Sequence, residues 1–104
     1  MQRAELLERV KRAVHEVEPE ADIVLYGSRA RGDAHAESDW DFLILLDGVV
    51  DEARTDAIRH RLYEIEWDCD EVLCSIVRSC QDWDSSLQQV TPFAKILREH
   101  GTRV

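Results

Sequence analysis

The sequence predicts an α+β or α/β sandwich that contains a small mixed β-sheet. Two observations carry this prediction. Some stretches repeat apolar residues at helical spacing, and short apolar runs of strand-forming residues lie between them. In chain order they indicate a helix, a strand, a short helical turn, a strand, a helix, a strand and further helices. This alternation is typical of helices layered on a sheet.

The N-terminal region carries the first two expected elements. Apolar residues at helical spacing predict a helix over residues 2–17, with Pro19 just past its end. An apolar run of strand-forming residues at 23–26 then predicts a strand that stops at Gly27. The positions of the first helix expected to face inward are Leu6, Leu7, Val10, Ala13, Val14 and Val17.

The middle of the chain predicts two strands with a helix between them. In residues 39–46 the polar residues alternate at first and then vanish, as in a central strand with one end in water. After a turn, residues 51–65 predict a helix, and residues 70–77 predict the third strand. The positions of this helix expected to face inward are Ala53, Ala57, Ile58, Leu62 and Ile65.

Two helix starts are expected in the C-terminal region. Ser79 followed by Asp82 resembles a capping box. Thr91 and Pro92 predict the start of a last helix, which Gly101 closes.

Length and composition favour one folded domain. The chain has 104 residues, of which 44% are hydrophobic and 34% charged. That is the size of one ordinary domain, with enough apolar material for a core. We therefore expect a single domain over residues 1–104.

The charge balance excludes several classes of partner. Lys and Arg total 13 against 22 Asp and Glu, a net charge of −9. Such an acidic chain is a poor candidate for non-specific binding to nucleic acid or to an anionic membrane. No apolar run approaches the ~20 residues of a membrane span, and no signal peptide is visible. A cytoplasmic location is expected.

Cysteine and histidine usage gives no sign of a disulfide framework or a zinc site. The three cysteines, Cys69, Cys74 and Cys80, are odd in number and form no C-x-x-C pair. We expect buried free thiols in a reducing compartment. The four histidines show no metal-ligand spacing.

The segment after the first strand has the properties of a phosphate loop. Gly27 and Ser28 come between a strand and a helical turn, where backbone N–H groups attract phosphate. Gly27 allows close approach of a ligand, and the Ser28 hydroxyl can cap the turn or touch a phosphate oxygen. Only one of Arg29 and Arg31 can point squarely at a triphosphate. The alternatives are a plain strand-to-helix turn and a solvated helical face.

Asp39 and Asp41 form a candidate metal site. At i and i+2 on a strand, both carboxylates point to one face, where they repel each other. A divalent cation resolves that repulsion, and Mg²⁺ is usually held by one or two carboxylates plus substrate phosphates. The alternative is a pair of solvent-facing residues at a strand end.

Two metal ions would need a third carboxylate. Asp70 is the best candidate, because it opens the third expected strand and its face continues as Val72, Cys74 and Ile76. Glu71 and an ordinary acidic loop remain as alternatives. The tryptophans at 40, 67 and 83 are interpreted as core or interface residues rather than base-stacking platforms.

These motifs resemble those of a known family. Gly27-Ser28, ten residues, then Asp39-Trp40-Asp41 resembles the signature of the DNA polymerase β-like nucleotidyltransferase superfamily. The segments Tyr-Gly-Ser-Arg-Ala-Arg-Gly-Asp and Ser-Asp-Trp-Asp are similar to motifs of its minimal nucleotidyltransferase (MNT) branch, of antitoxin type. The resemblance covers nearly the whole chain. It departs mildly at the third carboxylate, where Asp70 is followed by Glu71.

The resemblance implies a fold and a reaction. The fold would be a small mixed sheet with helices mainly on one side. Asp39, Asp41 and Asp70 would hold Mg²⁺, two ions in the family's pattern, and act as the catalytic residues. Phosphates of ATP would meet Gly27 and Ser28, with Arg29 and Arg31 nearby. An acceptor hydroxyl would attack the α-phosphorus and release pyrophosphate.

The resemblance also suggests a partner. Larger members of the superfamily carry extra acceptor-binding domains, and we expect none here, so the acceptor surface would come from a second protomer or a partner protein. In the MNT branch that partner is a HEPN-type toxin, which the antitoxin modifies by AMP transfer to a hydroxyl side chain (AMPylation).

Two other functions remain open on the sequence. The chain could be a non-catalytic binding module that neutralises a toxin by contact, through apolar residues left at the surface. It could also transfer a nucleotide to a small molecule such as an aminoglycoside. The candidate surface residues are Trp67, Trp83, Phe93, Ile96 and Leu97.

Overall fold

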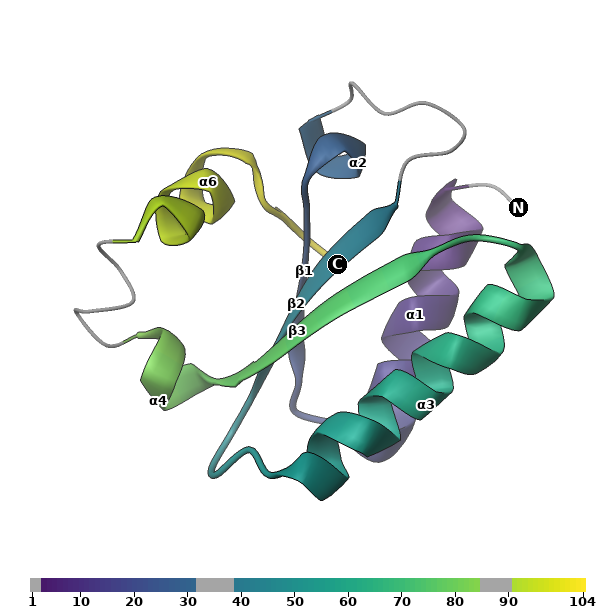
Figure 1. Ribbon diagram of the computed structural model, residues 1–104, viewed down its shortest axis with the longest axis horizontal. Helices are drawn as coiled ribbons and strands as arrows, with labels where there is room; N and C mark the ends of the chain where they lie inside the picture. The colour runs from purple at the N-terminus through teal and green to yellow at the C-terminus, as the bar shows by residue number, and fades with distance from the viewer. Residues whose placement is uncertain (1–2, 32–38, 85–90) are drawn as a thin grey trace.

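A four-stranded mixed sheet lies at the centre of the computed structural model, which describes residues 3–31, 39–84 and 91–104 (Figure 1). Its strand order is β3-β2-β1-β4. The strands are β1 (Asp22–Tyr26), β2 (Trp40–Leu46), β3 (Leu73–Ser79) and β4 (Thr102–Arg103). β1 runs antiparallel to β2 and to β4, whereas β2 and β3 are parallel. The predicted small mixed sheet is therefore confirmed.

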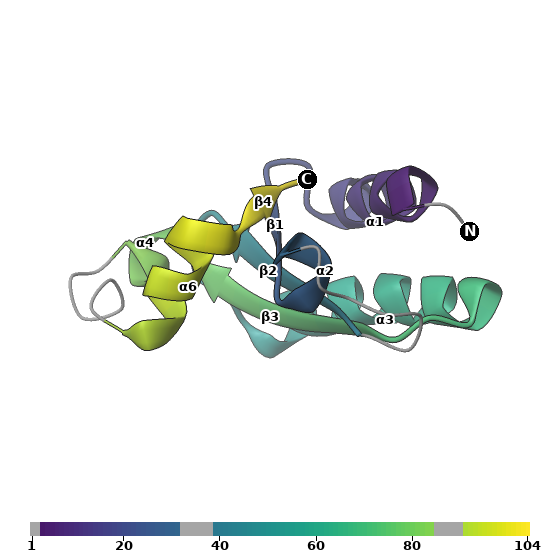
Figure 2. The same cartoon turned by 90° about the horizontal axis from the view of Figure 1, so that it is seen from above.

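The long helices cover one face of this sheet. Figure 2 shows α1 (Arg3–Val17) and α3 (Glu52–Cys69) on one side, and α6 (Pro92–His100) on the other. Two short helices, α2 (Ser28–Arg31) and α4 (Cys80–Trp83), follow β1 and β3. Among the described residues, no helix is both long enough and apolar enough to cross a bilayer.

Alternate side chains of the strands pack in two apolar layers, one on each face of the sheet. Alternate residues of β1 and β2, such as Leu25, Phe42 and Ile44, are fully buried in one core with α1 and α3. Leu43 is also buried, but its side chain points to the opposite face, as do those of Asp41 and Leu45. There α6 contributes the buried residues Ala94 and Leu97. The half of this second face nearer Asp41 carries the candidate site.

α3 is longer than predicted and has a narrower apolar stripe. Asp51 caps it, with a carboxylate that accepts a hydrogen bond from the backbone N–H of Arg54. The stripe consists of Ile58, Leu62 and Ile65. The expectation that Ala53 and Ala57 face inward is wrong, because at about 100° per residue both lie off this stripe and are exposed. In α1, Val17 is likewise 37% exposed at the end of the helix.

Because α3 continues to Cys69, the third strand begins later in the chain than predicted. Asp70 adopts a left-handed conformation with φ 55° and caps the helix through its backbone N–H, which donates to Glu66 O. β3 begins only at Leu73. The expectation that Asp70 opens this strand is therefore wrong.

The predicted caps of the later helices are confirmed. Ser79 Oγ accepts from Asp82 N at the start of α4, and Thr91 Oγ1 accepts from Ala94 N at the start of α6. β4 is a feature that the sequence pattern did not predict. It follows Gly101 and pairs with the free edge of β1.

Candidate functional site

The end of β1 and the start of β2 bring Gly27 against Asp41. The antiparallel register pairs Tyr26 with Asp41, so the next residue turns directly over that carboxylate. Gly27 has φ +75°, and a Cβ added there would lie 2.5 Å from Asp41 Oδ2. A side chain at this position would be strained by the positive φ and would push the Asp41 carboxylate aside. The glycine turn therefore meets one of the two candidate aspartates, Asp41.

Asp39 and Asp41 lie around one cysteine of β3. Asp41 is paired with Cys74 in the parallel register, and Cys74 Sγ approaches Asp39 Oδ2 at 3.9 Å. Both carboxylates thus border the same thiol, on the sheet face away from α1 and α3. Asp39 is exposed, and Asp41 is half-buried. The pair can be reached from solvent, as a ligand site requires.

The Asp39 and Asp41 carboxylates shift the pKa values of neighbouring groups. Burial raises the pKa of the Cys74 thiol, and the Asp39 and Asp41 carboxylates raise it further. Burial also raises the pKa of the Tyr26 hydroxyl, with Asp41 and Cys74 as additional causes. The thiol and the phenol therefore stay neutral at pH 7, and the site has the electrostatic character of a cation site.

The two candidates for the third carboxylate lie elsewhere. Asp70 is exposed at the end of α3 and lines a hollow with Trp67 and Glu66. Glu71 Oε2 accepts a hydrogen bond from Trp40 Nε1 at 3.2 Å. Within the described ranges, no group of three or more His, Cys, Asp or Glu side chains is placed to hold one metal ion.

Cys74, not Asp70, is the β3 residue beside the aspartate pair. Sequence reasoning treated this cysteine as a buried thiol, whereas it is a partly buried free thiol that touches the site. The signal that could have identified it is the parallel register between β2 and β3, which places Cys74 opposite Asp41.

Arg29 is held by protein groups. Its guanidinium lies 4.4 Å from the centroid of the Trp40 ring and 3.7 Å from Glu71 Oε2. The backbone carbonyl of Arg29 accepts from Arg3 Nη1. Trp40 is a core residue, as expected, at 4% exposure. A phosphate contact by Arg29 would require this arrangement to open, and it stays a prediction.

Part of the predicted phosphate loop lies outside what the structure describes. Ser28 and Arg31 belong to α2, but their side chains are not described, and neither are residues 32–38. Their predicted contacts with phosphate stay predictions. The described part of the loop is the Gly27 turn and the backbone of α2.

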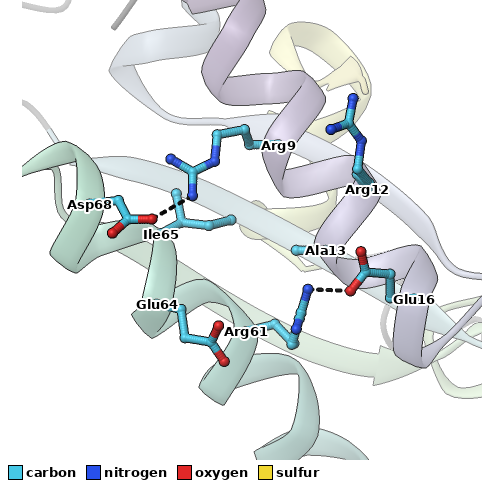
Figure 3. A pocket seen from close by; sticks show the side chains of 8 residues that line it. All are labelled: Arg9, Arg12, Ala13, Glu16, Arg61, Glu64, Ile65 and Asp68. Carbon is cyan, nitrogen blue, oxygen red and sulfur yellow. Dashed lines mark hydrogen bonds and ion pairs between the residues drawn. The ribbon is translucent and has the colours of Figure 1, made fainter.

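A separate cavity between α1 and α3 is a helix-packing feature. Figure 3 shows its ion pairs, Arg9 with Asp68 at 2.8 Å and Arg61 with Glu16. Its volume of about 130 Å³ is small beside the roughly 300–1,000 Å³ of ordinary small-molecule sites. These bridges join the two helices over the core.

Comparison with known proteins places the chain in a family. The family described as "Nucleotidyltransferase domain" matches residues 5–97. No match was found among curated proteins.

Two solved structures share the fold. One is described as a toxin–antitoxin with AMP-PNP; it has a TM-score of 0.64 and 16% identity, over 98% of this chain and 72% of that chain. The other is described as the toxin–antitoxin MntA-HpeT, mutant D39E D41E. It has a TM-score of 0.59 and 14% identity, over 99% of this chain and 72% of that one. At these identities the likeness shows a common fold.

Proposed function

The chain belongs to the nucleotidyltransferase domain family, and from this premise we propose that it transfers AMP from ATP to a hydroxyl acceptor. One observation carries the proposal. The Asp41 carboxylate lies so close to the Gly27 turn that an added Cβ would come within 2.5 Å of its Oδ2, and Asp39 and Asp41 lie beside the same Cys74 thiol. This arrangement brings carboxylate oxygens and the partly exposed backbone of Gly27 together at one point. We take residues 1–104 as a single minimal domain of this family.

The residues present fit a magnesium–nucleotide complex. Mg²⁺ prefers oxygen ligands and is commonly held by one or two carboxylates together with substrate phosphates. Asp39 and Asp41 would hold it, and the backbone at Gly27 and Ser28 would contact the phosphates. We assign no ligand role to Asp70, because it caps α3 and lines a different hollow. Bound Mg²⁺ would neutralise charge on the phosphates and on the attacking oxygen.

The proposed reaction is a displacement at phosphorus. The acceptor hydroxyl loses its proton to water, which reaches the site at the exposed Asp39, and its oxygen attacks the α-phosphorus. A new P–O bond forms, the bond to the bridging oxygen of the β-phosphate breaks, and pyrophosphate leaves. Asp39 and Asp41 would hold the cation that offsets their repulsion of the α-phosphate, and Gly27 would let that phosphate approach the backbone. Catalysis is then mostly positioning and electrostatic stabilisation.

We further propose that the acceptor is a HEPN-type toxin and that this chain is its antitoxin in the cytoplasm. Both solved structures are described as toxin–antitoxin complexes, and one of them contains AMP-PNP, an ATP analogue. The other carries two substitutions, D39E and D41E, whose spacing equals that of Asp39 and Asp41 here. These descriptions support a toxin partner and an adenine nucleotide as substrate.

Label transfer tests the proposal. The protein is incubated with Mg²⁺ and α-labelled ATP in a lysate of its host, beside Asp39→Asn and Asp41→Asn. We expect a labelled protein band with the wild type and a loss of about 10²-fold or more in each variant, since a metal ligand is removed. Asp47→Asn, at the far end of β2, is the matched control and should transfer normally. Undiminished transfer by both site variants would contradict the proposal.

A second candidate function is neutralisation by contact alone. It is favoured by the exposure of Trp67, whose surface is 74% accessible. In that case the Asp39→Asn and Asp41→Asn variants would still bind and still neutralise the toxin. Loss of neutralisation by a variant that still binds excludes this candidate.

A further inference from the structure

The outer face of α3 carries two exposed aromatic residues one turn apart. Tyr63 is 54% and Trp67 74% exposed. Their rings meet edge to face, with centroids 6.0 Å apart and an interplanar angle of 88°. They therefore form a preorganised apolar surface. Binding hot spots are enriched in Trp, Tyr and Arg side chains.

A continuous groove joins these aromatic residues to the candidate site. Tyr63 and Glu66 line two adjoining hollows. One, of about 430 Å³, reaches Cys74 on β3, and the other, of about 230 Å³, reaches Trp67 and Asp70. We call the surface formed by these five residues the α3–β3 groove. It runs along the α3 side of the edge strand β3, and the aspartate pair lies around that edge, on the other face of the sheet beside the Cys74 thiol.

The charge of the groove selects its occupant. Glu66 and Asp70 place carboxylates beside the aromatic rings, and Glu71 lines the smaller hollow with them. Arg59 lines the larger hollow, so three carboxylates face one cation among the residues that line the two hollows. A second copy of this chain, with a net charge of −9, would be repelled, and so would a nucleic acid. A segment with Lys or Arg side chains would pair with the carboxylates and could also stack on the rings.

We propose that the α3–β3 groove binds a basic, partly apolar segment of the acceptor protein and delivers its hydroxyl side chain to the site. The proposal rests on the proposed function for its acceptor chemistry. An apolar side chain of the segment packs on Trp67 and Tyr63, and its cations face Glu66 and Asp70. The segment then passes around the edge strand β3, which brings a neighbouring hydroxyl to the aspartate pair on the other face.

Binding of a defined peptide tests the groove without any chemistry. The probe is a short fluorescent peptide of Lys and Leu with one Tyr, and the matched peptide carries Glu in place of Lys. We expect Trp67→Ala and Tyr63→Ala each to weaken binding of the basic peptide by about tenfold, as for aromatic hot spots. The double variant Glu66→Gln/Asp70→Asn should weaken it severalfold. The matched double variant Glu20→Gln/Asp56→Asn removes the same charge elsewhere and should bind normally.

Several outcomes would contradict the proposal that the α3–β3 groove binds a basic segment. These are equal binding of the acidic and basic peptides, unchanged binding by Trp67→Ala, or an equal loss in the Glu20→Gln/Asp56→Asn variant. A concentration-dependent dimer that Trp67→Ala abolishes would assign the surface to a second copy instead. Trp67 and Tyr63 are exposed, so their variants should fold, and an unchanged thermal midpoint verifies this.

A transfer assay separates this proposal from the proposed function. Asp39→Asn should bind the basic peptide as the wild type does but label neither peptide nor protein. If the wild type transfers no label while Trp67→Ala and Tyr63→Ala still lose peptide binding, the proposed function is wrong and the groove is still a peptide-binding site. If Trp67→Ala transfers label to an acceptor protein normally, the groove does not deliver the acceptor, and the proposed function is retained.

Discussion

Gly27 is the residue on which the geometry of the candidate site depends most directly. It has φ +75°, and Gly48 provides a comparison with φ +77° in a turn where an added Cβ meets only Arg54 Nη1, at 3.8 Å. An alanine at either position should lose about 1–2 kcal/mol of stability to backbone strain. Only Gly27→Ala also drives a methyl group into the Asp41 carboxylate. We therefore expect Gly27→Ala to lose label transfer and Gly48→Ala to keep it, each measured at a temperature where both variants are folded.

Residue 74 lies beside Asp39 and Asp41, so its identity determines whether the site has two or three charged ligands. Its register position opposite Asp41 leaves two carboxylates and a neutral thiol at this edge of the sheet. Since metal affinity rises with the number of charged ligands, Cys74→Asp should bind Mn²⁺ on the order of tenfold more tightly than the wild type. Cys74→Ser should bind as the wild type does. Calorimetric titration measures both, and equal affinities in all three proteins would show that residue 74 does not face the metal.

One arginine connects three elements at the end of the molecule opposite the site. Arg54 of α3 donates to both carboxylate oxygens of Glu18, just after α1, at 2.7 and 2.8 Å. It also donates to the carbonyls of Asp47 and Val49, in the connection between β2 and α3. These hydrogen bonds from Arg54 hold the pKa of Glu18 below its usual range, although burial opposes them.

The lowered pKa of Glu18 predicts a pH-dependent contribution to stability. The folded state binds this proton less tightly than the unfolded state, so the contribution is fully present above the ordinary glutamate pKa of about 4.3 and is lost as pH falls through the folded-state pKa. Glu18→Gln should lower the thermal midpoint at pH 7 by several degrees. The difference from the wild type should shrink as the pH is lowered below 4. Glu20→Gln, in the same turn, should show neither effect, and a pH-independent difference would contradict the assignment.

Local periodicity predicted the elements, whereas pairing between distant segments decided the site. The alternation in residues 39–46 predicts that Asp39 and Asp41 share a face, and the structure places both beside one thiol. The run at residues 68–71 is polar and suits the end of a helix as well as a loop, so the sequence could not locate the left-handed cap at Asp70. The identity of the third side chain, Cys74, follows from the register of a parallel pair, which local pattern does not contain.

At the scale of the whole molecule, the candidate site joins segments that the fold must hold together. Gly27 ends β1, Asp41 lies in β2 and Cys74 lies in β3, so a ligand that contacts all three strands binds only the folded chain. Such binding stabilises the fold by mass action, by about 2.7 kcal/mol at a ligand concentration 100 times Kd. For a domain of this size that corresponds to a rise in thermal midpoint on the order of 10 °C. We expect Mg²⁺ with AMP-PNP to produce this rise, and each alone to produce much less.

The double variant Asp39→Asn/Asp41→Asn shows whether the rise comes from the proposed site. Removing two neighbouring carboxylates relieves their repulsion, so the variant alone should be at least as stable as the wild type. Its midpoint should no longer respond to Mg²⁺ with AMP-PNP, because the cation that joins nucleotide to protein has lost its ligands. Trp67→Ala should respond like the wild type, since the α3–β3 groove is proposed for the acceptor and not for the nucleotide. An equal rise in the double variant would place the nucleotide elsewhere on the molecule, and no rise in the wild type would remove the basis for AMP transfer while leaving neutralisation by contact.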